Sequence, residues 1–95
     1  ASLDAHSGML FIFSQPDYYR FWMPDMNFPI DIIWINGSEV VGINANVSNQ
    51  FDSKNPKFYT PPRAADKVLE VNAGWAADHN IKIGDPFSFV QGRPE

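Results

Sequence analysis

The segment FWMPDMNFPIDIIWINGSEVVGINANV, residues 21–47, decides the fold, because it holds the longest apolar run of the chain and its clearest turn signal. The dipeptide Asn36-Gly37 separates the runs IDIIWI and SEVVGI. An Asn-Gly pair between two such runs predicts a β-hairpin, since both residues tolerate the positive φ of a type I′ turn. The segment is therefore predicted to be the central hairpin of the domain.

A turn at Asn36-Gly37 also predicts which residues face one another across the hairpin. In this register Ile32 pairs with Val41, and every second side chain points to the same face of the sheet. One face then forms the core and consists of Ile30, Ile32, Trp34, Val41, Ile43, Ala45 and Val47.

The other face of the predicted hairpin is less apolar. It carries Ile33 and Val40, but also Asp31, which the same register places opposite Gly42. A carboxylate beside a residue without a side chain has room for a ligand. Asp31 is therefore the first candidate for chemistry.

Length and composition predict a single domain over residues 1–95. A chain of ninety-five residues can bury a core without disulfide bonds or structural metal ions, and eight Pro with six Gly indicate short elements joined by turns. The predicted class is mainly β, a β-rich α+β fold: a small barrel-like antiparallel or mixed sheet with the central hairpin and one short helix.

Charge and cysteine content exclude several classes of partner and site. The net charge is −4 and the seven basic residues form no stripe, so neither nucleic acid nor an anionic membrane surface is an expected partner. The chain has no cysteine and two histidines, so no metal site or other cofactor is expected. No run of eighteen apolar residues or signal-peptide pattern is present, so the chain is expected to be soluble, either cytoplasmic or exported after leader removal.

The segments on either side of the hairpin have weaker patterns. The run GMLFIF, residues 8–13, is apolar on both faces and predicts a central strand, and residues 14–20 could form one helical turn. Residues 48–66 hold three prolines without periodicity and predict a long surface loop.

The last third of the chain predicts a strand, a helix and a strand. Residues 68–71 alternate, with Leu69 and Val71 on one face. Asn72 is the expected N-cap of a short helix that buries Trp75, Ala76 and His79, and Asn80 is expected to end it in the left-handed conformation. Residues 86–91 form the predicted last strand, with Phe87 and Phe89 toward the core.

Several of these motifs together resemble a known family. GMLFIF, FWMPDMNFPIDIIWI, VVGI and VLEVNAGWAADHNIKIGD occur in the order and at the distances seen in the domain of unknown function 192 family of bacteria and archaea. The resemblance implies a compact, mostly β, barrel-like domain with a short helix. Because the family has no agreed activity, it implies no catalytic residues.

Two departures from similar sequences bear on function. The Trp22-Met23 pair is followed by Pro24, Asp25 and Met26, where similar sequences commonly carry Lys, Asn and Thr, so a cation is replaced by an anion. Relatives also usually carry a segment ahead of the GMLF strand, which begins here seven residues into the chain. The expectation is an uncovered sheet edge and self-association as a homodimer.

Each candidate residue has a structural interpretation beside its functional one. A buried Asp31 is more often held by backbone N–H groups than used in chemistry. Asp25, in a turn after proline, is favoured there because it caps local N–H groups. Glu70 could pair with Arg63 or Lys67, or join Asp31 in a two-carboxylate site.

Two functions remain open from the sequence. The preferred one is a non-catalytic binding module for a polar small molecule, a glycan or a partner peptide, with residues 48–66 and 22–28 as its mouth. The alternative is a hydrolase that uses Asp31 with Asp25 or Glu70 as acid and base. The candidate ligand-binding residues are Trp22, Asp25, Asp31, Tyr59 and Glu70.

Overall fold

The computed structural model of the protein describes residues 8–22, 29–47 and 58–88. Its main element is an antiparallel four-stranded sheet in the order β1-β6-β3-β4, whose strands span Gly8–Asp17, Ala65–Asn72, Ile30–Asn36 and Glu39–Val47. A second antiparallel pair joins two short strands, and one short helix follows: β2, β5 and α1 span Phe21–Trp22, Phe58–Tyr59 and Trp75–Asp78. The predicted mainly β class with a central hairpin and one short helix is confirmed.

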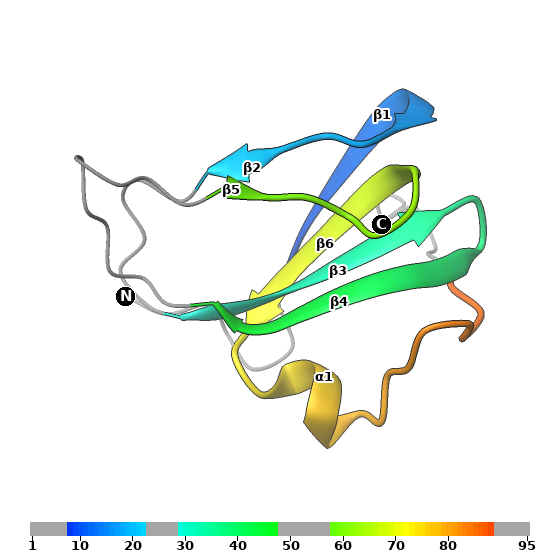
Figure 1. Cartoon of the computed structure of the whole chain (residues 1–95). Helices are drawn as coiled ribbons and strands as arrows, with labels where there is room; N and C mark the ends of the chain where they lie inside the picture. The colour runs from blue at the N-terminus through cyan, green and yellow to red at the C-terminus, as the bar shows by residue number, and fades with distance from the viewer. Residues whose placement is uncertain (1–7, 23–28, 48–57, 89–95) are drawn as a thin grey trace, which may run out of the picture.

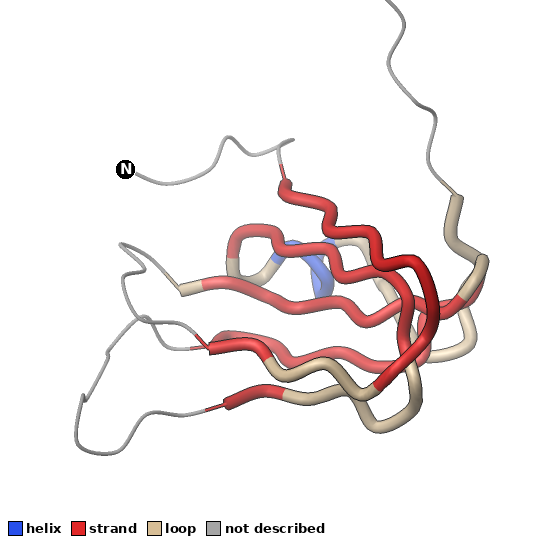
Figure 2. Tube along the Cα trace, turned by 90° about the horizontal axis from the view of Figure 1, so that it is seen from above, coloured by secondary structure: helices blue, strands red, loops and turns tan. Residues whose placement is uncertain are grey.

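The elements form three layers around the four-stranded sheet. The pair β2 and β5 lies on one side of the sheet and α1 on the other (Figure 1, Figure 2). We call these two sides the upper face and the helix face. The four-stranded sheet is not closed, since β1 and β4 form its edges, so the fold is barrel-like only in that β2 and β5 cover the upper face.

Both faces of the sheet are buried by apolar side chains. The upper cluster contains Ile30, Ile32, Trp34, Val41, Val47, Ala65 and Val68, with Phe13, Phe21 and Tyr59 packed against it. The helix-face cluster contains Ile33, Ile35, Val40, Val71 and Ala76. A strand that is covered on both faces has apolar side chains at nearly every position. This is why the sequence IDIIWI of β3 has only one polar residue.

The hairpin forms between β3 and β4, but the predicted register is wrong. The turn is at Gly37-Ser38 instead of Asn36-Gly37, and Ile32 faces Asn44 instead of Val41. The register shifts where Val41 stands without a partner between the pairs that Val40 and Gly42 make with β3. This β-bulge lets two residues oppose one and changes the partner of every residue beyond it.

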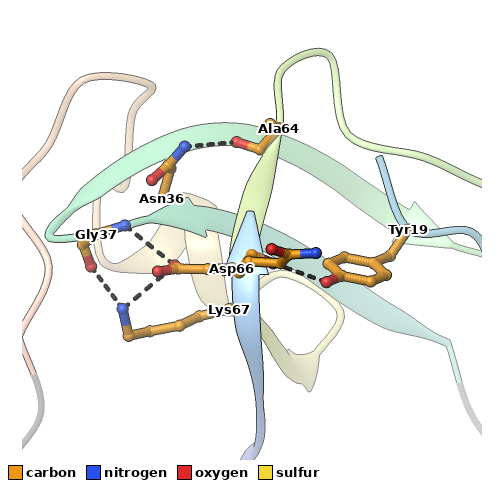
Figure 3. A network of polar contacts seen from close by, with 7 residues as sticks. Tyr19, Asn36, Gly37, Ala64, Asp66 and Lys67 are labelled. Atoms are coloured by element: carbon orange, nitrogen blue, oxygen red, sulfur yellow. Dashed lines mark hydrogen bonds and ion pairs between the residues drawn. The ribbon is translucent and has the colours of Figure 1, made fainter. Parts of the chain in front are cut away.

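Contacts from β6 and from Ala64, the residue before it, explain where the turn falls. The Asn36 side chain donates to the Ala64 carbonyl over 3.0 Å, which keeps Asn36 in the strand. The Gly37 N–H donates to Asp66 Oδ1 over 3.0 Å, and Lys67 Nζ donates to the Gly37 carbonyl over 2.8 Å (Figure 3). With Asn36 held in this way, Gly37 alone takes the positive φ of 63°.

Strand β1 is an edge strand, so its predicted central position is wrong. Its only partner among the described strands is β6, and Met9 and Ile12 are 46% and 59% exposed. The run GMLFIF is apolar because its aromatic residues contact the upper layer and not because the strand is central. Phe11 and Phe13 pack edge-on against Phe21. Residues 14–17 continue the strand and do not form the predicted helical turn.

The predictions for β6 are confirmed, and those for the flanking loop are partly wrong. Leu69 and Val71 lie with the helix-face cluster and Val68 with the upper cluster. Of the predicted loop, residues 48–57 lie outside the described residues, Phe58–Tyr59 form β5, and Ala65 begins β6. Within the described residues, no helix is long and apolar enough to cross a membrane.

Candidate functional site

Asp31 is a helix cap supplied by a strand. Its side chain is 1% exposed, and the carboxylate accepts hydrogen bonds from the N–H groups of Asn46 (2.9 Å), Gly74 (3.1 Å) and Ala76 (2.9 Å). Gly74, with a φ of 95°, is the N-cap residue and makes no side-chain cap of its own, so the expected N-cap at Asn72 is wrong. The interpretation of Asp31 as a structural acceptor is confirmed.

A second irregularity in the hairpin brings Asp31 to this position. Ile30 pairs with Val47 and Ile32 with Asn44, so Ala45 and Asn46 together oppose Asp31. Asn46 takes the left-handed conformation, with a φ of 55°, and directs its N–H at the carboxylate. The expected pairing of Asp31 with Gly42 is therefore wrong.

Glu70 is the other carboxyl group that is buried among the described residues, and it lies on the opposite face. It is 5% exposed and pairs with Ile32 of the upper cluster, whereas Asp31 pairs with Val71 of the helix-face cluster. Directly paired residues share a face, so the sheet separates the two carboxyl groups. Burial raises the pKa of Glu70, because desolvation penalises its charged form.

The other predicted site residues belong to the upper layer or lie outside the described residues. Trp22 and Tyr59 are on β2 and β5, where they pair with Phe58 and Phe21. Tyr59 is half-buried and packs against the upper cluster, on the side of the sheet that carries Glu70. Asp25 lies outside the described residues.

The structure contains a pocket on the helix face, which we call the helix-face pocket. Its volume is about 450 Å³, and it is lined by Ile33, Val40, Leu69, Trp75, Ile81, Asp85, Pro86, Phe87 and Ser88. The sheet forms its floor with buried Ile33 and Val40 and half-buried Leu69, and half-buried or exposed residues of α1 and the segment after it form its walls. The pocket is therefore largely apolar, with the polar groups of Asp85 and Ser88 on one wall.

Hydrogen bonds to the hairpin hold the outer wall of the pocket. Val40 donates to the Asp85 carbonyl (2.9 Å) and accepts from Gly84 (2.8 Å), and Phe87 donates to the Ser38 carbonyl (2.7 Å). A last strand was predicted over residues 86–91. Of these residues, Pro86 forms an isolated antiparallel bridge with Glu39, and Phe89 lies outside the described residues. Because the wall is tied to β4 by its backbone, the pocket is preformed.

Helix α1 supplies the other wall. Ala76 is buried, Trp75 is half-buried and faces the pocket, and Asn80 has the expected positive φ of 54°. His79 is exposed, so its predicted burial is wrong. Its ring stacks on Trp75 with centroids 4.1 Å apart and its Nδ1 lies 2.8 Å from the Trp75 carbonyl oxygen, which orients the indole.

Of the predicted ligand-binding residues, Asp31, Tyr59 and Glu70 are fully described, and none of the three lines the helix-face pocket. One signal was present in IKIGDPFSF, where Gly84, Asp85 and Pro86 indicate a turn between apolar residues. The local sequence does not say that the chain returns along β4 after this turn. Among the described residues, no three His, Cys, Asp or Glu side chains come close enough together to hold a metal ion.

Comparisons with known proteins give a family and a fold. The family named domain of unknown function 192 and described as "Uncharacterized ACR" matches residues 1–89. A protein of unknown function from Novosphingobium aromaticivorans is 33% identical, with a TM-score of 0.78 over 88% of this chain. A protein described as "a putative transcription regulator" from Sinorhizobium meliloti is 25% identical, with a TM-score of 0.74 over 83% of this chain.

The likeness to these two structures covers 58% and 59% of their chains, so this chain spans less than two thirds of their length. No protein of curated function matches the chain. The family match extends over most of the sequence and agrees with both structural likenesses. The chain belongs to the domain of unknown function 192 family.

Proposed function

We propose that the domain is a non-catalytic binding module that holds a small molecule in the helix-face pocket. The observation that carries this proposal is the preformed wall, which three backbone hydrogen bonds tie to the hairpin. A volume of about 450 Å³ is in the range of small-molecule sites. A ligand would therefore not need to move the wall away from the sheet before it binds. Little conformational entropy is then lost on binding, because the wall is already ordered.

The lining indicates the general character of the ligand. Ile33 and Val40 at the floor offer no hydrogen-bond partner, so a buried hydroxyl or amide would lose its contacts with water there. Asp85 and Ser88 can accept hydrogen bonds at the wall. The expected ligand thus has an apolar body and a polar end, and a wholly polar ligand or a glycan fits less well.

The hydrolase alternative has less support. Acid and base catalysis by two carboxyl groups needs both beside the same bond. Asp31 and Glu70 are on opposite faces of the sheet, and Asp31 accepts three backbone hydrogen bonds. These contacts favour binding over catalysis by this pair.

A titration with indole, followed by methyl and amide NMR shifts, tests the proposal. Indole should shift the methyl resonances of Ile33, Val40 and Leu69, and Ile81→Trp should abolish the shifts by filling the pocket. Ile83→Trp is the matched control, because Ile83 is 61% exposed and does not line the pocket. Shifts that centre elsewhere, or that persist in the Ile81→Trp variant, would contradict the proposal.

A further inference from the structure

We infer that the helix-face pocket selects a ligand with one aromatic ring and a positively charged amine at one end. This inference rests on the proposed binding function and adds the charge of the ligand. Among the residues that the structure describes, Asp85 is the only charged one that lines the pocket. An apolar pocket whose single charge is negative favours a cation at the same end of the ligand.

The Asp85 carboxylate is held in place by its own segment. Its Oδ2 accepts a hydrogen bond from the Lys82 N–H over 2.8 Å, and its own N–H donates to the Lys82 carbonyl over 3.0 Å. Within the described residues, Oδ1 has no hydrogen-bond donor and the Lys82 ammonium forms no ion pair with this carboxylate. Among the described residues, no donor therefore competes with a ligand for Oδ1 of this half-buried carboxylate, where an ion pair is screened less than on the surface.

The aromatic ring of the ligand would lie among three large side chains. Trp75, Ile81 and Phe87 are half-buried and line the walls. The stack of His79 on Trp75 keeps the indole in one orientation, so a ligand ring can pack against it without ordering it first. The net charge of −4 also attracts a cationic ligand to the protein over longer distances.

Three probes that share a phenyl ring separate the charge inference from the pocket itself: 2-phenylethylamine, 2-phenylethanol and 3-phenylpropionate. At neutral pH and low salt, we expect the amine to bind about tenfold more tightly than the alcohol, which corresponds to one partly buried ion pair, and the acid to bind most weakly. Equal affinities for the three probes would overturn the charge inference and leave the pocket assigned. Failure of all three to bind would overturn both.

The variant Asp85→Asn assigns the preference to this carboxylate. The amide oxygen can still accept from the Lys82 N–H, so the turn is kept while the charge is lost. Affinity for the amine should fall to that for the alcohol, whose own affinity should not change. Asp78→Asn is the matched control, an exposed carboxylate outside the pocket lining, and should keep the preference. A preference for the amine that survives Asp85→Asn would overturn the inference.

Discussion

Asp31 and Glu70, the two buried carboxyl groups among the described residues, show how the same chemical group has different surroundings on the two faces of the sheet. Asp31 accepts hydrogen bonds from three backbone N–H groups, whereas Glu70 lies on the upper face, where burial raises its pKa. The environment of each group is set by strands and turns far away in the sequence. Both were candidate site residues, and the contacts of Asp31 give it a structural role.

We predict that Asp31→Ala lowers the free energy of unfolding by more than about 3 kcal/mol. The substitution leaves the N–H groups of Asn46, Gly74 and Ala76 without an acceptor, and hydrogen bonds to a charged group contribute about 1.5–3 kcal/mol each. Urea unfolding measures the loss, and Asp31→Asn should lie between wild type and Ala. Asp17→Ala, at an exposed carboxylate, is the control. A loss below about 1 kcal/mol for Asp31→Ala would contradict the role as a cap.

The raised pKa of Glu70 predicts a dependence of stability on pH. Because burial raises this pKa above its ordinary value of 4.5, the folded protein keeps the proton at pH values where the unfolded chain has released it. The contribution of Glu70 to stability therefore falls as the pH rises from about 4.5 through the folded pKa, and is constant above it.

The variant Glu70→Gln should lack this contribution and be more stable than wild type above the folded pKa. Urea unfolding between about pH 4 and pH 8 gives the difference between wild type and variant as a function of pH. Glu39→Gln, at an exposed position of β4, should follow the wild-type curve. A constant difference between wild type and Glu70→Gln across this range would show that burial does not shift the titration of Glu70.

At the level of elements, local patterns predicted strands and faces, and distant contacts decided their details. Alternation placed Leu69 and Val71 on one face because a period of two is a property of the strand itself. The position of the hairpin turn depends on hydrogen bonds with Ala64 and Asp66, about thirty residues away in the sequence. No local sequence pattern around Asn36 and Gly37 indicates these contacts. The helix-face pocket could not be predicted for the same reason, since it needs the chain to return along β4.

The bulge in β4 leads to a prediction for Gly42. A Cβ at this position would meet Cδ of Pro62 at less than a contact distance and lie 2.8 Å from its Cγ and 3.2 Å from Trp34 Cδ1. We expect Gly42→Ala to destabilise the protein by about 1–3 kcal/mol, as overpacking does in cores. In a double-mutant cycle by urea unfolding, Pro62→Ala should recover much of this loss because it removes both ring atoms. Additive effects of the two substitutions would contradict the steric explanation.

For the whole molecule, the strand order leaves β3 and β6 in the interior and β1 and β4 at the edges. The segment after α1 binds the start of β4 and shields part of that edge. On β1 the described residues provide one neighbour, β6, with regular pairing from Gly8 to Ile12. The two edges therefore differ, and β1 carries three exposed large apolar side chains, those of Met9, Phe11 and Ile12.

The exposed edge of β1 predicts that this chain forms a dimer by strand pairing. Residues 8–15 carry no charge and no proline, the features that usually protect an edge, and Met9 and Ile12 are 46% and 59% exposed. Antiparallel pairing of β1 with its copy across a two-fold axis would satisfy the backbone groups of both edges and cover these side chains. Light scattering at high micromolar concentration should give the mass of a dimer. Ile12→Lys should give a monomer, because a lysine on an edge opposes pairing, whereas Ile83→Lys, at an equally exposed isoleucine outside the sheet, should stay dimeric. A monomeric wild type at that concentration would show that β1 does not pair with a second copy.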